Sequence, residues 1–187
     1  IYLAFFKPVA NGIWSGNIKK YGVQQVDNPS AGIYAGDIID ANGLKALDDN
    51  GQFYSTARSF WTLSTMDGGE VEQGGVGEVL MTRLDLRNVY TYFYTNVSLN
   101  HSSNNFQTTN ASITPTVLGL LEGDTDGRYK LIRFTRGWDA YDDNGNGILD
   151  EERRDWILGS FLHSRPVIIH YTGGRSVVFA GSNDGMM

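Results

Sequence analysis

The sequence predicts a mainly β protein, built from antiparallel sheets with a few short helices and long loops. Three observations support this class. Short apolar runs alternate with turn pairs such as Asn-Gly and Ser-Gly, which is typical of hairpins. Glycine is abundant, at 23 of 187 residues, and proline is scarce, at 4. Aromatic residues reach 12% and favour strands, where their rings pack against neighbouring side chains.

The first third of the chain carries the clearest strand pattern. Each apolar run there is followed by turn residues, which occur for example at 11–12 and 42–43. Tight turns of this kind join antiparallel neighbours. The strands predicted in this part span residues 1–6, 17–23 and 33–39.

The middle of the chain is less regular. The alternation lapses over residues 56–63 and 70–83, where glycines at 74, 75 and 77 limit any helix to a short or broken one. Residues 87–97 are rich in β-branched and aromatic side chains and predict a further strand.

A Ser/Thr/Asn tract at 96–116 has little to bury and predicts an exposed loop. It also holds three N-x-S/T sequons, so glycosylation of an exported protein is an alternative that the residue types leave open. The sequons begin at Asn96, Asn100 and Asn110.

The last third predicts two short helices and then a return to strands. Apolar residues in 129–136 share one helical face, and Asp150 is a candidate N-cap for a helix over 151–158. The apolar runs at 166–171 and 176–181 predict strands.

Composition excludes several classes of protein. Hydrophobic residues make up 41% and charged residues 19%, which argues against a disordered chain, and no apolar run approaches the roughly 18 residues of a membrane span. A net charge of -6 provides no basic field for nucleic acid. The absence of cysteine excludes disulfides and thiolate sites. Because both ends read as strands cut from a larger sheet, we expect residues 1–187 to be a single segment of a longer polypeptide.

The pattern with most chemistry in it lies at residues 142–150, which read Asp-Asp-Asn-Gly-Asn-Gly-Ile-Leu-Asp. Oxygen side chains fall at positions one, three, five and nine, glycine at six and a backbone carbonyl at seven, as in calcium-binding loops. Alternate residues of a tightly coiled loop can direct their oxygens to one centre. The predicted Ca²⁺ ligands are Asp142, Asn144, Asn146, the Ile148 carbonyl and Asp150.

Position twelve of the pattern departs from a helix-loop-helix calcium site, because Arg153 stands where a bidentate glutamate is expected. We therefore expect a nine-residue loop, completed by water or by an oxygen from elsewhere. An Asx-rich turn without a metal is the alternative. Similar starts at Asp40, Asp48 and Asp124 do not continue the pattern and predict ordinary turns.

Other candidates for chemistry are weaker. The three histidines, His101, His163 and His170, share no metal-ligand spacing. No G-x-S-x-G elbow frames Ser164 as a nucleophile. We therefore expect no enzymatic activity.

Four stretches resemble the PilY/PilC family of type IV pilus biogenesis factors and tip adhesins, and they follow one another in the family's order. The last stretch is the most specific. They are FKP at 6–8 with WSGNIKKY at 14–21, ARSFW at 57–61, RNVYTY at 87–92, and LGSFLHSRPV at 158–167 leading into VVFAGSNDGM at 177–186.

The resemblance implies a modified, quinoprotein-like β-propeller, of which this chain would be a fragment, in the carboxy-terminal half of a large exported protein. The family's calcium loop has the form D-x-[DN]-x-[DN]-x-x-x-D, and the four side-chain ligands predicted above occupy those positions. The resemblance further implies a place at the pilus tip, on the outer-membrane or extracellular side. Minor pilins would be partners there, and host or abiotic surfaces are further candidates.

The leading hypothesis is thus a non-enzymatic, calcium-binding module that supports pilus assembly and biases extension against retraction. Calcium would neutralise the loop's carboxylates and order the surface around them. Two alternatives stay open. One is a quinoprotein-like propeller enzyme, and the other is a structural cell-surface domain without metal.

Overall fold

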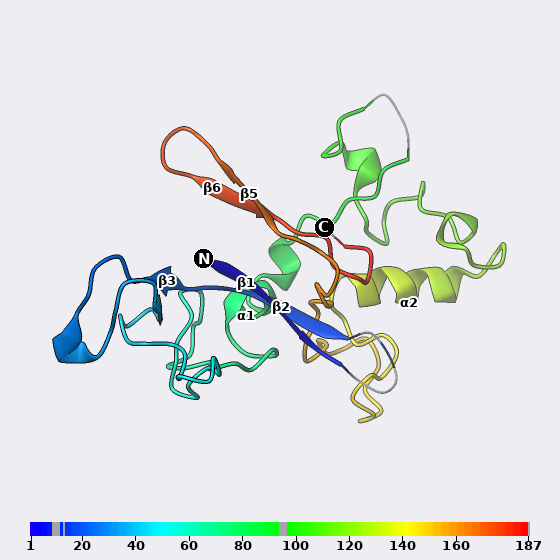
Figure 1. Ribbon diagram of the computed structural model, residues 1–187. Helices are drawn as coiled ribbons and strands as arrows, with labels where there is room; N and C mark the ends of the chain where they lie inside the picture. Colours follow the sequence, from blue (N-terminus) through cyan, green and yellow to red (C-terminus); the bar gives the residue numbers. More distant parts are fainter. Residues whose placement is uncertain (9–11, 13, 94–96, 187) are drawn as a thin grey trace. The chain divides into compact units, whose positions relative to one another are not determined.

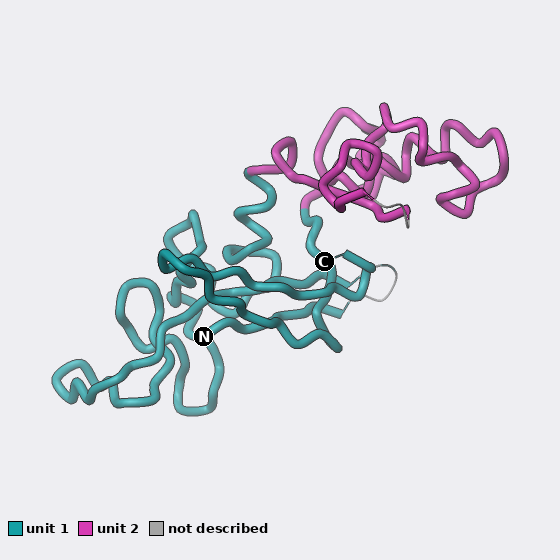
Figure 2. Tube along the Cα trace, turned by 90° about the horizontal axis from the view of Figure 1, so that it is seen from above, with its two compact units in different colours: residues 1–82, 156–187 teal, residues 83–155 magenta. Residues whose placement is uncertain are grey.

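The structure is a computed structural model that describes residues 1–8, 12, 14–93 and 97–186. The chain divides into two compact units, Ile1–Thr82 with Trp156–Met187 and, between them in sequence, Arg83–Asp155 (Figure 2). The first unit is formed by both ends of the chain. Each unit is described by itself below.

The first unit contains three two-stranded antiparallel sheets, which Figure 1 shows with their labels. The prediction of a mainly β, antiparallel protein is confirmed at this level, although the sheets of the described residues do not close into a propeller. The pairs are β1 (Tyr2–Lys7) with β2 (Ser15–Lys20), β3 (Gly22–Val23) with β4 (Ile38–Ile39), and β5 (Val167–His170) with β6 (Ser176–Phe179).

Strand β2 is buried although its sequence is polar. Asn17 is fully buried, and its side-chain Nδ2 donates to the carbonyls of Val71 and Gly74 at 2.8 and 2.9 Å. Its Oδ1 accepts from the Gly77 amide, at 3.1 Å, inside helix α1 (Gly75–Met81). One amide side chain thus satisfies backbone groups that would otherwise lose hydrogen bonds on burial.

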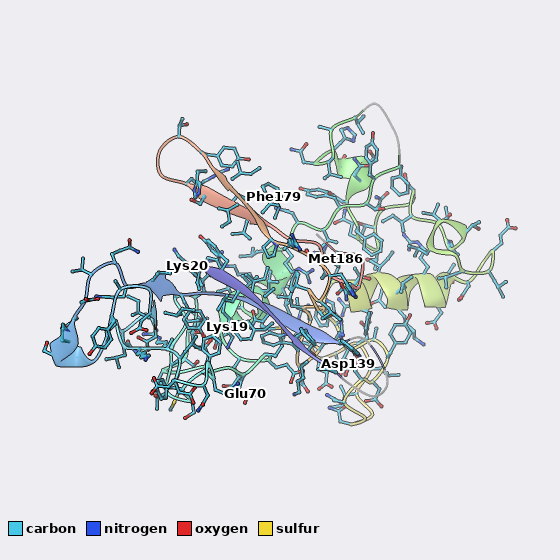
Figure 3. All side chains as sticks on the ribbon, viewed as in Figure 1. Lys19, Lys20, Glu70, Asp139, Phe179 and Met186 are labelled. Atoms are coloured by element: carbon cyan, nitrogen blue, oxygen red, sulfur yellow. The ribbon has the colours of Figure 1, made fainter. Side chains whose placement is uncertain are left out.

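The next buried polar residue of β2 is Lys19, which Figure 3 labels. Its Nζ lies 2.9 Å from Asp67 Oδ2, and both side chains have no solvent exposure. Desolvation lowers the pKa of Lys19, and the pairing with Asp67 opposes that shift. The ion pair ties the loop around Asp67 to β2.

Beside this ion pair lies a small aromatic core. Tyr21, Ala46 and Ala57 are buried together, with Leu3, Phe5, Ile38 and Phe53 packed against them. The Phe53 ring lies 5.0 Å from the Tyr21 ring and 5.5 Å from the Phe5 ring, centroid to centroid. Burial raises the pKa of the Tyr21 phenol.

The β5–β6 ribbon has an apolar face that the described residues leave open. The register pairs Val167 with Phe179 and Ile169 with Val177, so these four side chains share one face. Val167 keeps 57% of its surface exposed and Phe179 keeps 40%. The two strands nevertheless lie where the sequence predicts them.

The second unit is organised by α2 (Thr125–Thr135). The Asp124 side chain accepts from the Gly127 amide at 2.8 Å and caps this helix, so the turn predicted at Asp124 is the start of α2. Ile113 and Ile132 are fully buried in this unit. The short 3-10 helices of the chain are η1 (Pro29–Ala31), η2 (Leu84–Leu86), η3 (Ser102–Asn104) and η4 (Thr116–Leu118).

Two predicted strands are mostly wrong. Of residues 33–39, only β4 is a strand, because Ile33 bridges back to Asn28 in a tight loop. Of residues 87–97, the described part has a single bridge, between Tyr90 and Asn105, instead of a ladder. Residues 94–96 lie outside the described residues.

The helix predicted at 151–158 is also wrong. Arg153 forms a β-bridge with Trp138, and the Arg154 amide donates to the Gly137 carbonyl at 3.1 Å. These backbone groups are therefore used in a long-range pairing that a helix would exclude. The tract at 96–116 is not simply exposed, since Asn104 and Ile113 have no exposed surface. Among the described helices, none is long and apolar enough to cross a membrane.

Candidate metal-binding loop

The predicted calcium loop follows α2 and is drawn in yellow in Figure 1. Backbone pairing between the residues just before and just after the loop closes it. Trp138 and Arg153 form the β-bridge described above, the Asp139 amide donates to the Glu152 carbonyl at 3.1 Å, and the Asp150 amide donates to the Asp139 carbonyl at 3.0 Å. The two ends of the loop are thus fixed to each other.

Within the loop, the side chains at positions one, three and five all turn inward to backbone amides. Asp142 Oδ1 accepts from Gly147 N at 3.0 Å, Asn144 Oδ1 from Asn146 N at 3.0 Å, and Asn146 Oδ1 from Ile148 N at 2.8 Å. The bonds of Asn144 and Asn146 are Asx turns, and the bond from Gly147 to Asp142 spans five residues around them. The structure therefore brings three of the predicted ligands into one coil.

The backbone of the loop is left-handed at both of its terminal ligands. Asp142 has φ +58° and Asp150 has φ +61°, and they are the only non-glycine residues with positive φ in the described chain. Gly147, at position six, has φ +82°, as the sharp turn requires. Aspartate adopts this left-handed conformation more readily than most residues, because its short polar side chain can hydrogen-bond locally.

Asp150, the ligand predicted at position nine, faces α2. Its Oδ1 accepts from Arg133 Nε at 2.6 Å, and its backbone carbonyl accepts from Arg133 Nη2 at 2.8 Å. Interaction with the Asp150 carboxylate raises the pKa of the Tyr129 phenol. The structure thus pairs Asp150 with a guanidinium, whereas the other three side-chain ligands accept from backbone amides of the loop.

The Ile148 carbonyl was predicted as the ligand at position seven. Ile148 lies at the end of the coil, where the Ile148 amide donates to Asn146 Oδ1. Ile148 is 45% exposed. The exposed side chain leaves the exit of the loop open to solvent.

Glu152 and Asp139 are two acidic residues at the loop that the sequence pattern did not assign. Glu152 Oε1 accepts from the side-chain amides of both Asn144 and Asn146, at 2.8 Å each. Asp139 is 1% exposed, and its Oδ1 accepts from Asp143 N at 2.7 Å. Its Oδ2 is buried, and no hydrogen-bonding partner among the described residues reaches it. Figure 3 labels Asp139.

Three arginines balance this acidic loop. The guanidinium carbons of Arg133 and Arg153 each lie 3.4 Å from the centroid of the Trp138 ring. Two groups this close to one ring centroid must occupy opposite faces. Arg154 pairs with Asp143 at 3.0 Å and stacks on Phe134 at 3.8 Å. Stacked guanidinium groups of this kind form cation–π contacts and stay oriented for ion pairing.

The donors in and around the loop suit a hard cation by their chemistry. They are carboxylate, amide and backbone oxygens, the ligand types that Ca²⁺ takes. The buried Asp139 Oδ2 adds one oxygen without a hydrogen-bonding partner. No three His, Asp or Glu side chains converge as a ready metal-binding group in the described residues. A cation here would therefore depend on amide and carbonyl oxygens as well.

The two similar sequences that start at Asp40 and Asp48 form ordinary turns, as predicted. Asp40 Oδ1 accepts from the Asn42 and Leu44 amides at 2.8 and 2.9 Å. Asp48 Oδ1 accepts from Asn50 and Gln52 in the same way, at 2.9 and 2.8 Å. Each is a single Asx turn that does not continue into a coil.

One sequon asparagine and two of the histidines have local structural contacts. Asn96 lies outside the described residues and Asn100 is exposed. The Asn110 amide donates to two backbone carbonyls, at 2.8 and 2.9 Å. The ring nitrogen of His101 accepts from the Ser103 amide, and His170 pairs with Ser176 across the β5–β6 ribbon at 2.8 Å.

Comparison with known proteins adds no relative, since no family model, curated protein or solved structure matches the chain.

Proposed function

We propose that this chain is a calcium-binding module of a pilus-tip biogenesis and adhesion protein, with the metal held at residues 142–150. The observation that carries the proposal is the coil itself, in which side-chain oxygens of three predicted ligands accept from backbone amides of the same short loop. Asp142 accepts from Gly147, Asn144 from Asn146, and Asn146 from Ile148. Calcium would supply the positive charge that allows the neighbouring carboxylates to approach one another.

The chain's own residues would do the remaining work. The Trp138–Arg153 bridge fixes the loop's ends, and the buried Asp139 and the bridging Glu152 are the nearest candidates for the oxygen from elsewhere that the nine-residue loop lacks. The propeller fold, the export of the protein, its minor-pilin partners and the bias toward extension are parts of the same proposal. They rest on the four sequence stretches that resemble the PilY/PilC family.

A structural turn without metal is the second candidate, and a specific observation favours it. Glu152 already satisfies the amides of Asn144 and Asn146, and Arg133 already pairs with Asp150. A loop with its polar groups satisfied in this way can stay coiled without a cation.

Calcium titration with calorimetry and thermal melts separates the two candidates. Calcium in the millimolar range should raise the melting temperature of the whole chain, and EDTA should reverse the rise. The Asp142→Ala variant should abolish the shift, whereas Asp48→Ala, which removes an Asx turn of similar sequence, should retain it. A melting temperature that does not change with calcium would contradict the calcium site and favour the structural turn without metal.

A further inference from the structure

The contact between Arg133 and Asp150 bears on how the loop takes up a cation. The Arg133 guanidinium donates from Nε to the Asp150 carboxylate, at 2.6 Å, and from Nη2 to the Asp150 carbonyl, at 2.8 Å. Arg133 belongs to α2, so this helix occupies the group that the loop pattern assigns to position nine.

We infer that Arg133 is a resident cation that competes with calcium for the Asp150 carboxylate, and that it thereby sets the calcium affinity of the loop and couples occupancy to α2. This inference rests on the proposed function. A carboxylate oxygen that accepts a short, charge-assisted hydrogen bond from a guanidinium has less electron density to offer a metal ion. Calcium uptake therefore requires Arg133 to withdraw, or to share Asp150.

The stacking geometry gives Arg133 a place to remain once Asp150 is withdrawn. Its guanidinium already lies 3.4 Å from the centroid of the Trp138 ring and 6.0 Å from that of Tyr129. These ring faces stabilise the cation without Asp150. The exchange can therefore proceed without moving Arg133 fully into solvent.

Arg153 provides a matched control. It stacks on Trp138 at the same 3.4 Å and has a similar side-chain exposure, 27% against 20% for Arg133. Its own ion pair, however, is with Asp85 and not with a predicted ligand of the loop. Substituting either arginine by methionine removes one positive charge and one cation–π contact with Trp138, and the Arg133 variant also loses its more distant contact with the Tyr129 ring. Only the Arg133 variant frees Asp150.

The test is a calcium titration of the full chain by calorimetry, with calcium chloride as the probe and magnesium chloride for comparison. Arg133→Met should bind calcium roughly tenfold more tightly than the parent chain, as expected for loss of a charge-assisted competitor. Arg153→Met should change the affinity much less. Equal changes in both variants, or weaker binding by Arg133→Met, would overturn the inference.

A second measurement uses the parent chain and does not depend on the folding of a variant. In an NMR titration with calcium, the Arg133 Nε–H signal should shift together with the Gly147 amide. A Gly147 shift with an unmoved Arg133 signal would overturn the competition while leaving the calcium loop intact. If neither the parent chain nor Arg133→Met responds to calcium, the proposed function itself fails.

Discussion

At the scale of single residues, the buried Lys19–Asp67 ion pair is a contact whose loss would strongly destabilise the protein. Both side chains have no exposure, and Lys19 also donates to the carbonyls of Asp67 and Gly68 at 3.2 and 3.3 Å. Such a pair gains little over an apolar pair, but removing one partner leaves a charge in the interior. Its importance therefore lies in the cost of breaking it.

We predict that Lys19→Met destabilises the chain by about 3–5 kcal/mol, because the Asp67 carboxylate would remain buried without its cation. Lys20→Met is the neighbouring control. Lys20 lies over the rings of Phe60 and Trp61, at 5.6 and 6.0 Å, and its loss should cost about 1 kcal/mol. Urea denaturation measures both values, and equal losses would contradict the prediction.

Residues in the loop could be predicted where the contacts are local. The Asx turns at Asn144 and Asn146 and the hydrogen bond of Asp142 join residues two to five positions apart, so the local pattern of residue types is enough to predict a coiled loop. The Arg133–Asp150 pair spans 17 positions and Lys19 lies 48 from its partner. No periodicity carries that information, and both pairs were missed.

At the scale of elements, helix α1 packs closely against the Trp156 ring at Gly77. A Cβ on Gly77 would lie 1.9 Å from the Trp156 ring, whose Nε1–H donates to the Gly16 carbonyl at 2.9 Å. The ring is held by that hydrogen bond and cannot easily shift. Glycine at this position is therefore required by packing and not by the helix itself.

Gly77→Ala should consequently destabilise the chain by about 1–3 kcal/mol, since overpacking outweighs the roughly 1 kcal/mol that alanine gains over glycine in a helix. Gly181→Ala is the control, because its nearest non-neighbouring atom would lie 3.9 Å away. Thermal melts of the two variants should differ clearly. A neutral effect of Gly77→Ala would show that Trp156 can move.

Elements were predictable where one local pattern decided the outcome. The strands β1, β5 and β6 and the helix α2 follow from apolar runs and turn residues close to each in sequence. The helix expected at 151–158 is absent because Arg153 pairs with Trp138, 15 positions away. The described part of the strand expected at 87–97 has a single bridge instead of a long partner strand. In both cases tertiary pairing decided the structure.

At the scale of the whole molecule, the division into two units locates any effect of calcium. The coil, the helix α2, Asp139 and Arg153 all belong to Arg83–Asp155. The chain ends and the three sheets belong to the other unit. The hydrogen bonds and ion pairs of the loop named above all join residues of this unit.

We predict that calcium slows amide hydrogen exchange in residues 139–152 and in α2, and leaves the β1–β2 sheet unchanged. Binding stabilises the segments that order the site, and the free energy of local opening rises there first. Mass spectrometry of peptides from the whole chain, with EDTA as reference, measures this. Uniform protection of both units would contradict the prediction.

The stack of Trp138 between two guanidinium groups also has a practical consequence. Trp14, Trp61 and Trp156 fall in the first unit, which leaves Trp138 as the sole indole of Arg83–Asp155. Arg133 touches both this ring and Asp150. Trp138 is thus an intrinsic fluorophore whose emission is sensitive to the charges beside it. A change in its emission maximum or intensity can report a change at the acidic loop without an added dye.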